Sequence, residues 1–221
     1  MTAYDPSEER SGWTALHNCA SYGHRECVQL LVRGGSDVNA REEGNWTPLH
    51  CAAHRGRTEA VRALLETPGI DVNPKSLESK ETPLHRAAVS GSADTTELLL
   101  KHGAHVDAVT DCNGESPLHT AADKCDTRVL KLLVAAGADI KLESEDGRTA
   151  YDFAEYPWSP EDIIKTRRQS LALEFLRSIN APRGSWKRKA RHTARYFAEK
   201  GVYMNSQGCL EKLTSQDTMV V

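Results

Sequence analysis

The stretch Thr47-Pro48-Leu49-His50 decides how this chain folds, because close variants of it return along most of the 221 residues. The variants are Thr-Ala-Leu-His at 14–17, Thr-Pro-Leu-His at 82–85, Ser-Pro-Leu-His at 116–119 and a degenerate Thr-Ala-Tyr-Asp at 149–152. Successive copies begin 33, 35, 34 and 33 residues apart. A nearly constant period of this length indicates a repeat architecture in which each unit packs only on its neighbours.

Each copy of the phrase has the features of a helix start. The Thr or Ser hydroxyl can accept a hydrogen bond from an unpaired amide, and proline at the first helical position loses no hydrogen bond. The leucine then points into the core, and small pairs such as Ala52-Ala53 let neighbouring helices approach closely. In three units a glycine ends this helix. A second helix follows with one buried stripe, which in the first unit comprises Val28, Leu30 and Leu31.

A period near 33 residues with this phrase resembles the ankyrin repeat, a turn followed by two helices. The resemblance covers about residues 11–180 and implies an all-α repeat solenoid of stacked helix-turn-helix units with β-hairpin fingers. We expect an ankyrin repeat domain at 11–181 and a basic tail, partly helical or disordered, at 182–221. The expected units lie near 12–44, 45–79, 80–113, 114–146 and 147–181.

The last unit is expected to be an atypical carboxyl cap, because array ends must close off the core. A serine-capped helix is predicted from about Ser159 to Ile179, and Pro182-Arg183-Gly184 is predicted to break the chain after it. Beyond Gly201 the sequence is polar and without a clear period, which favours disorder. Within the array, Cys125 stands where three units have glycine. Since a left-handed backbone costs a non-glycine residue about 1–2 kcal/mol, we expect a reshaped turn there.

Cysteine usage and hydropathy place the chain in the cytoplasm, the nucleus or both. The amino end has no apolar signal core, and no apolar run is long enough to span a membrane. There is no Cys-x-x-Cys pair, and several cysteines fall where a repeat needs small buried residues, which is typical of a reducing compartment. The six are Cys19, Cys27, Cys51, Cys112, Cys125 and Cys209.

Charge divides the chain into an acidic array and a basic tail. Residues 1–147 hold 15 Lys and Arg against 23 Asp and Glu, whereas residues 148–221 hold 13 against 8. In the tail, Lys187, Arg188, Lys189 and Arg191 are a candidate nuclear import signal. The stretch 183–200 has two further interpretations: an amphipathic helix that binds nucleic acid, acidic membrane or a calmodulin-like protein, or a helix packed on the cap. The final Met-Val-Val is a weak candidate for recognition by a PDZ groove.

The residues that could carry chemistry favour a structural role. Histidines one unit apart cannot converge on one metal ion, so we expect those of the repeat phrase to bond the backbone between adjacent turns. They are His17, His50, His85 and His119. The sequence has no glycine-rich phosphate loop and no nucleophile elbow. We therefore expect no enzyme, no cofactor, no metal and no catalytic residue.

Trp13 and Trp46 stand just before the Thr of the first two units, on the fingers. Such tryptophans either form a binding hot spot or lie flat and shield the next finger. The variable first-helix positions that should face the concave groove complete the candidate site: Asn18, Tyr22, Cys51, His54, Arg55, Arg86, Ser90, Thr120 and Lys124. The sequence thus predicts a monomeric, non-catalytic scaffold or adaptor for a partner protein. Nucleic acid is not the expected partner, although binding through the tail is the rival interpretation.

Asn39 and Asn73 each lie eight residues after a leucine, in an Asp-Val-Asn finger. This resembles the ankyrin asparagines that an asparaginyl hydroxylase modifies. The alternative is that each asparagine tolerates the turn and bonds its own backbone.

Overall fold

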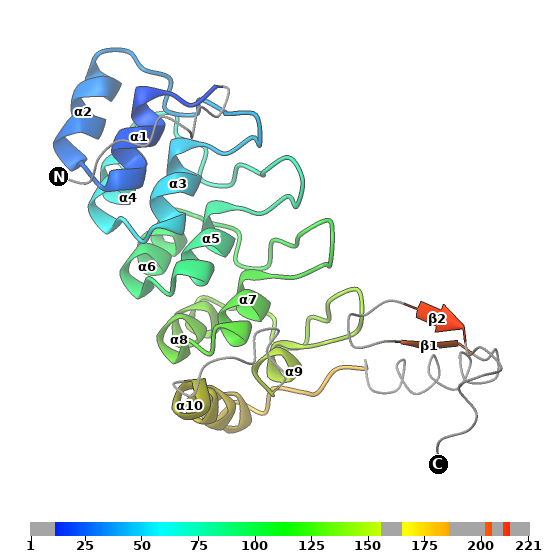
Figure 1. Cartoon of the computed structure of the whole chain (residues 1–221). Coiled ribbons are helices and arrows are strands. Elements are labelled where there is room, and N and C mark those ends of the chain that lie inside the picture. The colour runs from blue at the N-terminus through cyan, green and yellow to red at the C-terminus, as the bar shows by residue number, and fades with distance from the viewer. Residues whose placement is uncertain (1–11, 156–164, 186–201, 205–209, 213–221) are drawn as a thin grey trace.

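The computed structural model describes residues 12–155, 165–185, 202–204 and 210–212. Within these ranges ten helices stand in two adjacent rows, with the fingers projecting from one side (Figure 1). The inner row consists of α1 (Ala15–Tyr22), α3 (Pro48–His54), α5 (Pro83–Ser90), α7 (Pro117–Asp123) and α9 (Ala150–Glu155). The outer row consists of α2 (Arg25–Arg33), α4 (Thr58–Leu65), α6 (Ala93–Lys101), α8 (Thr127–Ala135) and α10 (Lys165–Ser178).

Each helix packs on the next helix of its own row and on the other helix of its unit. Leucines and alanines of the repeat phrase fill the space between the rows, and Leu49, Leu84, Ala52 and Ala88 are fully buried. The predicted all-α repeat solenoid is therefore confirmed. No helix in the described ranges is both long and apolar enough to cross a membrane.

The histidines of the first three repeat phrases each connect two units, whereas His119 bonds a carbonyl oxygen within 114–146. In each of the four, Nδ1 accepts the backbone N–H of the capping Thr or Ser at 3.0–3.2 Å. Since Nδ1 accepts, Nε2 carries the proton and donates to a backbone carbonyl oxygen. His17 reaches Trp46 at 3.0 Å, and His50 reaches Glu81 and His85 reaches Glu115 at 3.1 Å. His119 reaches Leu142 at 3.0 Å. The predicted structural role of the histidines is thereby confirmed.

These histidines are held neutral. Burial in the stack lowers the pKa of all four imidazoles, against the opposing effect of the hydrogen bond to the carbonyl. For His50 and His85 the pKa falls to about 4. The connection between units therefore depends on neutral imidazoles.

The fingers are hairpin-shaped loops. Each is closed by a backbone hydrogen bond, for example from Glu42 N to Trp46 O at 3.1 Å and from Ser76 N to Glu81 O at 3.0 Å. Within residues 12–155, however, these bonds do not continue into regular strands. Each finger therefore depends on its contacts with the next unit.

The buried stripe predicted for the second helix of the first unit is wrong at Leu30. Its side chain is 67% exposed, whereas Ala63 and Leu98, at the same repeat position, are 4% and 9% exposed. Those residues are covered by the preceding unit. In the described ranges the main helix contacts of α2 are with α1 and α4, and no described helix of the outer row precedes it to cover its outer face.

The reshaped turn predicted at Cys125 is also wrong. Cys125 has φ of 53°, in the left-handed region that Gly56 and Gly91 occupy at 60° and 67°. Asp126 then caps α8 by accepting the N–H groups of Arg128 and Val129, and the Cys125 side chain is buried. Because the cap and the core contact both require this backbone, the fold imposes the conformation despite its cost.

Cys19 and Cys27 form a disulfide that links α1 to α2. The helical hairpin brings these two residues, eight positions apart, into contact. A disulfide differs from the usage typical of a reducing compartment that the sequence indicated. Cys51 and Cys125 are buried, and Cys112 is exposed.

The carboxyl cap is closed by the segment predicted to be a break. Thr149 and Gly184 both donate their backbone N–H to Asp152 Oδ2, at 3.1 and 2.6 Å. Ser185 donates its N–H and its hydroxyl to Glu143. A Cβ on Gly184 would lie 2.2 Å from Gly147 O, so only glycine fits. Residues 182–185 thus pack on the last unit and do not leave it.

Further along, the prediction of disorder beyond Gly201 is wrong for two short segments. β1 (Val202–Met204) pairs antiparallel with β2 (Leu210–Lys212), with Tyr203 opposite Glu211. The predicted start of the last helix at Ser159 lies outside the described residues, and α10 ends one residue before the predicted Ile179.

Candidate functional site

A pocket of about 400 Å³ opens between the first two units of the inner row. It is lined by residues of α1 and α3, of the finger ends before them, and of the turn before α4. Among the described residues these are Trp13, Ser21, Trp46, Cys51, His54, Arg55 and Arg57. Five of the seven belong to the binding set predicted from sequence, and the structure brings those five together.

Trp13 is half-buried and held on both sides of its ring system. Its indole stacks on His17, with centroids 5.1 Å apart, and its Nε1 donates to Asn18 Oδ1 at 2.8 Å. Asn18 therefore acts on the pocket through Trp13.

Trp46 is also half-buried and is packed between polar neighbours. It stacks on His50 at 5.9 Å and meets the edge of His54 at 5.5 Å. The Arg86 guanidinium lies over the indole, 4.5 Å from its centroid, and pairs with Glu81. Each tryptophan thus covers the histidine of its own unit while part of it lines the pocket.

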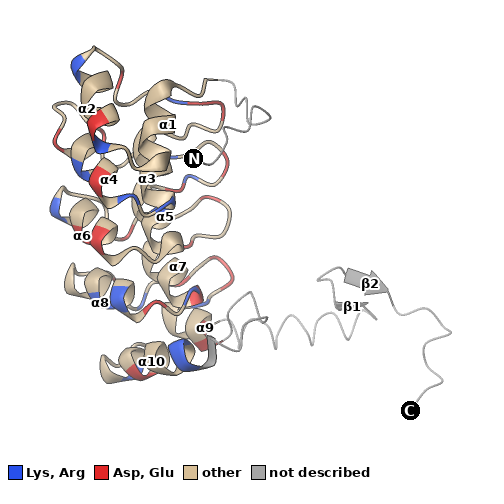
Figure 2. Cartoon of the chain, turned by 60° about the vertical axis from the view of Figure 1, so that its left-hand side comes forward, with Lys and Arg blue, Asp and Glu red and all other residues tan. Residues whose placement is uncertain are grey.

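The pocket is lined by two arginines that have no ion-pair partner among the described residues. The Arg55 guanidinium lies over the Tyr22 ring at 5.7 Å, and Arg57 Nε donates to Ser21 O at 3.3 Å. By contrast, Figure 2 shows acidic positions recurring along the fingers and both signs of charge on the outer row.

Three of the predicted positions, Ser90, Thr120 and Lys124, do not line the pocket. Ser90 and Thr120 bond carbonyls of their own helices, at 2.9 and 3.3 Å, and Lys124 pairs with Asp123. Cys51 was predicted on an open face but is only 2% exposed. It lies at the pocket wall, because α1 packs against α3 beside it.

Two lining residues, Ser21 and Arg57, were missed from the sequence. Arg57 follows the turn glycine of its unit, as His24 and Ser92 do in theirs. A comparison of that turn position across units would have shown that the second unit carries a large cation there.

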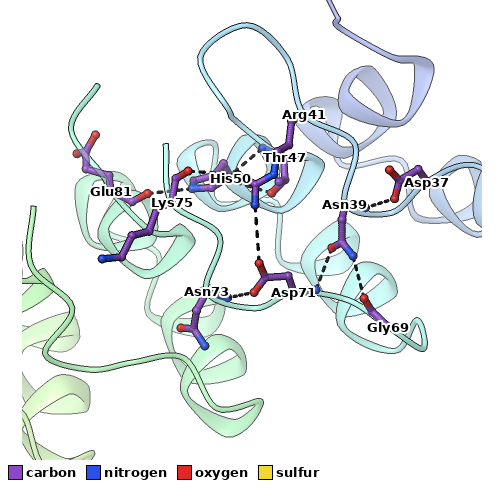
Figure 3. A network of polar contacts seen from close by, with 10 residues as sticks. All are labelled: Asp37, Asn39, Arg41, Thr47, His50, Gly69, Asp71, Asn73, Lys75 and Glu81. Carbon is purple, nitrogen blue, oxygen red and sulfur yellow. Dashed lines mark hydrogen bonds and ion pairs between the residues drawn. The ribbon is translucent and has the colours of Figure 1, made fainter. Parts of the chain in front are cut away.

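Asn39 and Asn73 connect fingers (Figure 3). Asn39 donates through Nδ2 to Gly69 O at 2.8 Å and accepts from Asp71 N at 2.9 Å. Asn73 repeats both bonds one unit later, to Gly103 O at 3.0 Å and from His105 N at 2.7 Å. Both side chains therefore bond the next unit, not their own backbone as the alternative held. Hydroxylation of either residue stays a prediction.

The described ranges hold no group of three or more His, Cys, Asp or Glu side chains that could bind a metal ion. The candidate import signal, Lys187, Arg188, Lys189 and Arg191, lies outside the described residues, as does most of the stretch 183–200. Of that stretch, Arg183 pairs with Glu155 at 2.7 Å and lies over the Tyr151 ring. Arg183 is thus bound to the cap.

Comparison with known proteins agrees with this architecture. A family model described as ankyrin repeats (3 copies) matches residues 2–76 and 73–144. The chain is 43% identical to the human protein named ankyrin repeat domain-containing protein 37, over 43% of this chain and 58% of that protein. It is 31% identical to the Drosophila melanogaster NF-kappa-B inhibitor cactus, over 66% of this chain and 29% of cactus.

A third relative is the Danio rerio putative palmitoyltransferase ZDHHC13, 30% identical over 76% of this chain. The match covers only 26% of that protein. The chain therefore spans between about a quarter and three fifths of these relatives, and what it shares with them is the repeat array. It belongs to the ankyrin repeat family.

Proposed function

We propose that this chain is a non-catalytic scaffold or adaptor that holds a partner protein against the inner helices and fingers of its amino half. Ankyrin repeats generally mediate protein–protein interactions, and one relative is named as an inhibitor of another protein, NF-kappa-B. The observation that carries the proposal is the pocket in which Trp13 and Trp46 meet His54 and Arg55.

The pocket has the physical character of a binding hot spot. Tryptophan and arginine are the side chains that most often carry binding energy at protein interfaces, where they lie in partly enclosed sites. Stacking on histidine and the bond to Asn18 fix the indoles before any partner arrives. A preorganised surface loses little side-chain entropy on binding.

The proposal includes a monomer that acts in the cytoplasm, the nucleus or both. The basic stretch that contains Lys187 and Arg188 would then serve import. Deleting residues 186–195 should abolish nuclear accumulation of a fluorescent fusion, and unchanged accumulation would contradict this part of the proposal.

Two exposed apolar side chains allow a matched test. Tyr22, which lies beside the pocket arginine Arg55, is 46% exposed, and Leu171 on α10 is 48% exposed. Proteins captured from cell extract by the full chain are compared by quantitative mass spectrometry with those captured by Tyr22→Ala and Leu171→Ala. The proposal expects a set of proteins that Tyr22→Ala loses by about tenfold, which is a typical hot-spot loss, and that Leu171→Ala retains.

The rival interpretation gives a different result in the same experiment. Binding through the basic tail would persist in Tyr22→Ala and weaken steeply between low and physiological salt. Capture that depends on salt but not on Tyr22 would overturn the proposal.

A further inference from the structure

We infer that the pocket between the first two units takes an acidic peptide segment of the partner, with carboxylates bound at Arg55 and Arg57 and an apolar side chain against Trp13 and Trp46. The inference rests on the proposed function and adds the chemistry of the partner. A pocket of about 400 Å³ is large enough for one such side chain and its neighbours.

Charge is the first argument. Among the described lining residues there are two arginines and no aspartate or glutamate. Nearby arginines are neutralised, since Arg25 pairs with Glu59 and Glu66, and Arg86 pairs with Glu81. Arg55 and Arg57 have no such carboxylate in the described ranges. An anion that enters the pocket would therefore supply the ion pairs that this part of the fold lacks.

The donors are also oriented before binding. Arg57 is anchored through Nε to Ser21 O, and Arg55 lies over the Tyr22 ring. Both contacts leave terminal guanidinium N–H groups for a carboxylate, which guanidinium binds in a planar, two-bond geometry. The half-buried indoles beside them reduce access of water, which strengthens a charged hydrogen bond.

A basic partner is disfavoured by the same geometry. A lysine or arginine of the partner would meet the like charges of Arg55 and Arg57. The Trp46 face, which could attract a cation, is already occupied, because the Arg86 guanidinium covers it at 4.5 Å. The remaining array is acidic, with eight more Asp and Glu than Lys and Arg in residues 1–147. An acidic segment would therefore be attracted at this pocket and repelled elsewhere on the array.

The test uses the full chain and three pools of fluorescein-labelled peptides, each with one central phenylalanine or leucine. The flanking positions carry Asp and Glu in one pool, Asn and Gln in the second, and Lys in the third. Affinities are measured by fluorescence anisotropy. The acidic pool should bind about tenfold or more tightly than the amide pool, since hydrogen bonds to a charged group are stronger than those to a neutral amide.

Two double variants localise the binding. Arg55→Gln with Arg57→Gln should weaken the acidic peptides by about tenfold. Arg33→Gln with Arg128→Gln removes the same charge from exposed arginines outside the pocket, with no ion pair in the described ranges, and should leave the affinity within about twofold. Both are repeated in the background Asp5→Asn, Glu8→Gln, Glu9→Gln, so that the acidic leader of the chain cannot mask binding by competition.

The other possible outcomes each overturn the inference, the proposed function or both. Preference for the amide or lysine pool, with loss in Trp46→Ala, overturns the acidic partner but leaves the proposed function standing. If the acidic peptides bind and neither the Arg55→Gln, Arg57→Gln double variant nor Trp46→Ala changes their affinity, the binding site lies elsewhere. That result would overturn both the inference and the proposed function. Absence of binding by any acidic peptide in both backgrounds overturns the inference.

Discussion

The two ends of the array differ in how the residue before the capping Thr packs on its unit. At the amino end, Trp13 and Trp46 cover the histidines of their units and leave a pocket open between them. At the carboxyl end, the residue before the Thr is Arg148, which is buried with its guanidinium 4.1 Å from the Phe153 centroid. There the chain returns and seals the last unit through Gly184. One repeat position thus lines the proposed binding pocket at one end and closes the array at the other.

The largest difference between the ends should come from pH. The unfolded chain protonates its histidines near pH 6.5, whereas the folded chain holds His50 and His85 neutral down to a pKa of about 4. The contribution of these two histidines to the free energy of unfolding is therefore fully present above pH 6.5. It decreases as the pH drops toward 4. The loss approaches about 3 kcal/mol for each of these two residues. Urea unfolding across this range measures it.

Hydrogen exchange by unit sharpens that prediction. The units joined by His50 and His85 should open before the last unit, where Asp152 replaces the histidine. As a control, His50→Gln with His85→Gln should flatten the pH dependence between 6.5 and 4, because glutamine does not titrate. An unchanged slope would show that other groups cause the acid sensitivity.

A smaller effect is expected at the sealed end. Gly184→Ala should destabilise the last unit by about 1–3 kcal/mol, since its Cβ would overlap Gly147 O and Asp152. Gly34→Ala, whose Cβ would lie 3.3 Å from its nearest neighbour, is the matched control. Exchange at the amides of α9 and α10 should rise for the first variant only. Equal protection in both variants would mean that residues 182–185 do not hold the cap.

The smallest effect is expected at Cys125. Replacement by glycine relieves a left-handed backbone worth about 1–2 kcal/mol but removes a buried side chain. The second effect costs a similar amount, so Cys125→Gly should change the free energy of unfolding by less than about 1 kcal/mol. Chemical denaturation measures it, and a loss above 2 kcal/mol would show that packing by the thiol outweighs the strain.

The structural features that recur in every unit could be predicted from the sequence. The predictions failed for features that occur in one unit only. The phrase at 47–50 and its period were sufficient for the helix pairs, the caps and the inter-unit role of His50. Leu30 was misassigned because its repeat position is buried only when a unit precedes it. The disulfide between Cys19 and Cys27 depends on a helix-to-helix distance that spacing alone does not give.

The candidate site was predicted only in part, because some of its residues occupy a recurring position and others do not. Trp13 and Trp46 were identified by their shared position in the repeat, and their enclosure depends on how adjacent units stack. Arg57 was missed because it lies in the turn before α4 and not on the groove-facing side of a first helix. Its free charge could be recognised only once the ion pairs of its neighbours were known.

The last unit has Asp152 at the position where the earlier units have histidine. The first three units each offer a histidine N–H to a carbonyl oxygen of the next unit. Asp152 offers a carboxylate oxygen, which accepts the amide of Gly184 and would repel such a carbonyl. A further ordinary unit grafted after residue 181 would meet the wrong polarity, so extension of the array would first require Asp152→His.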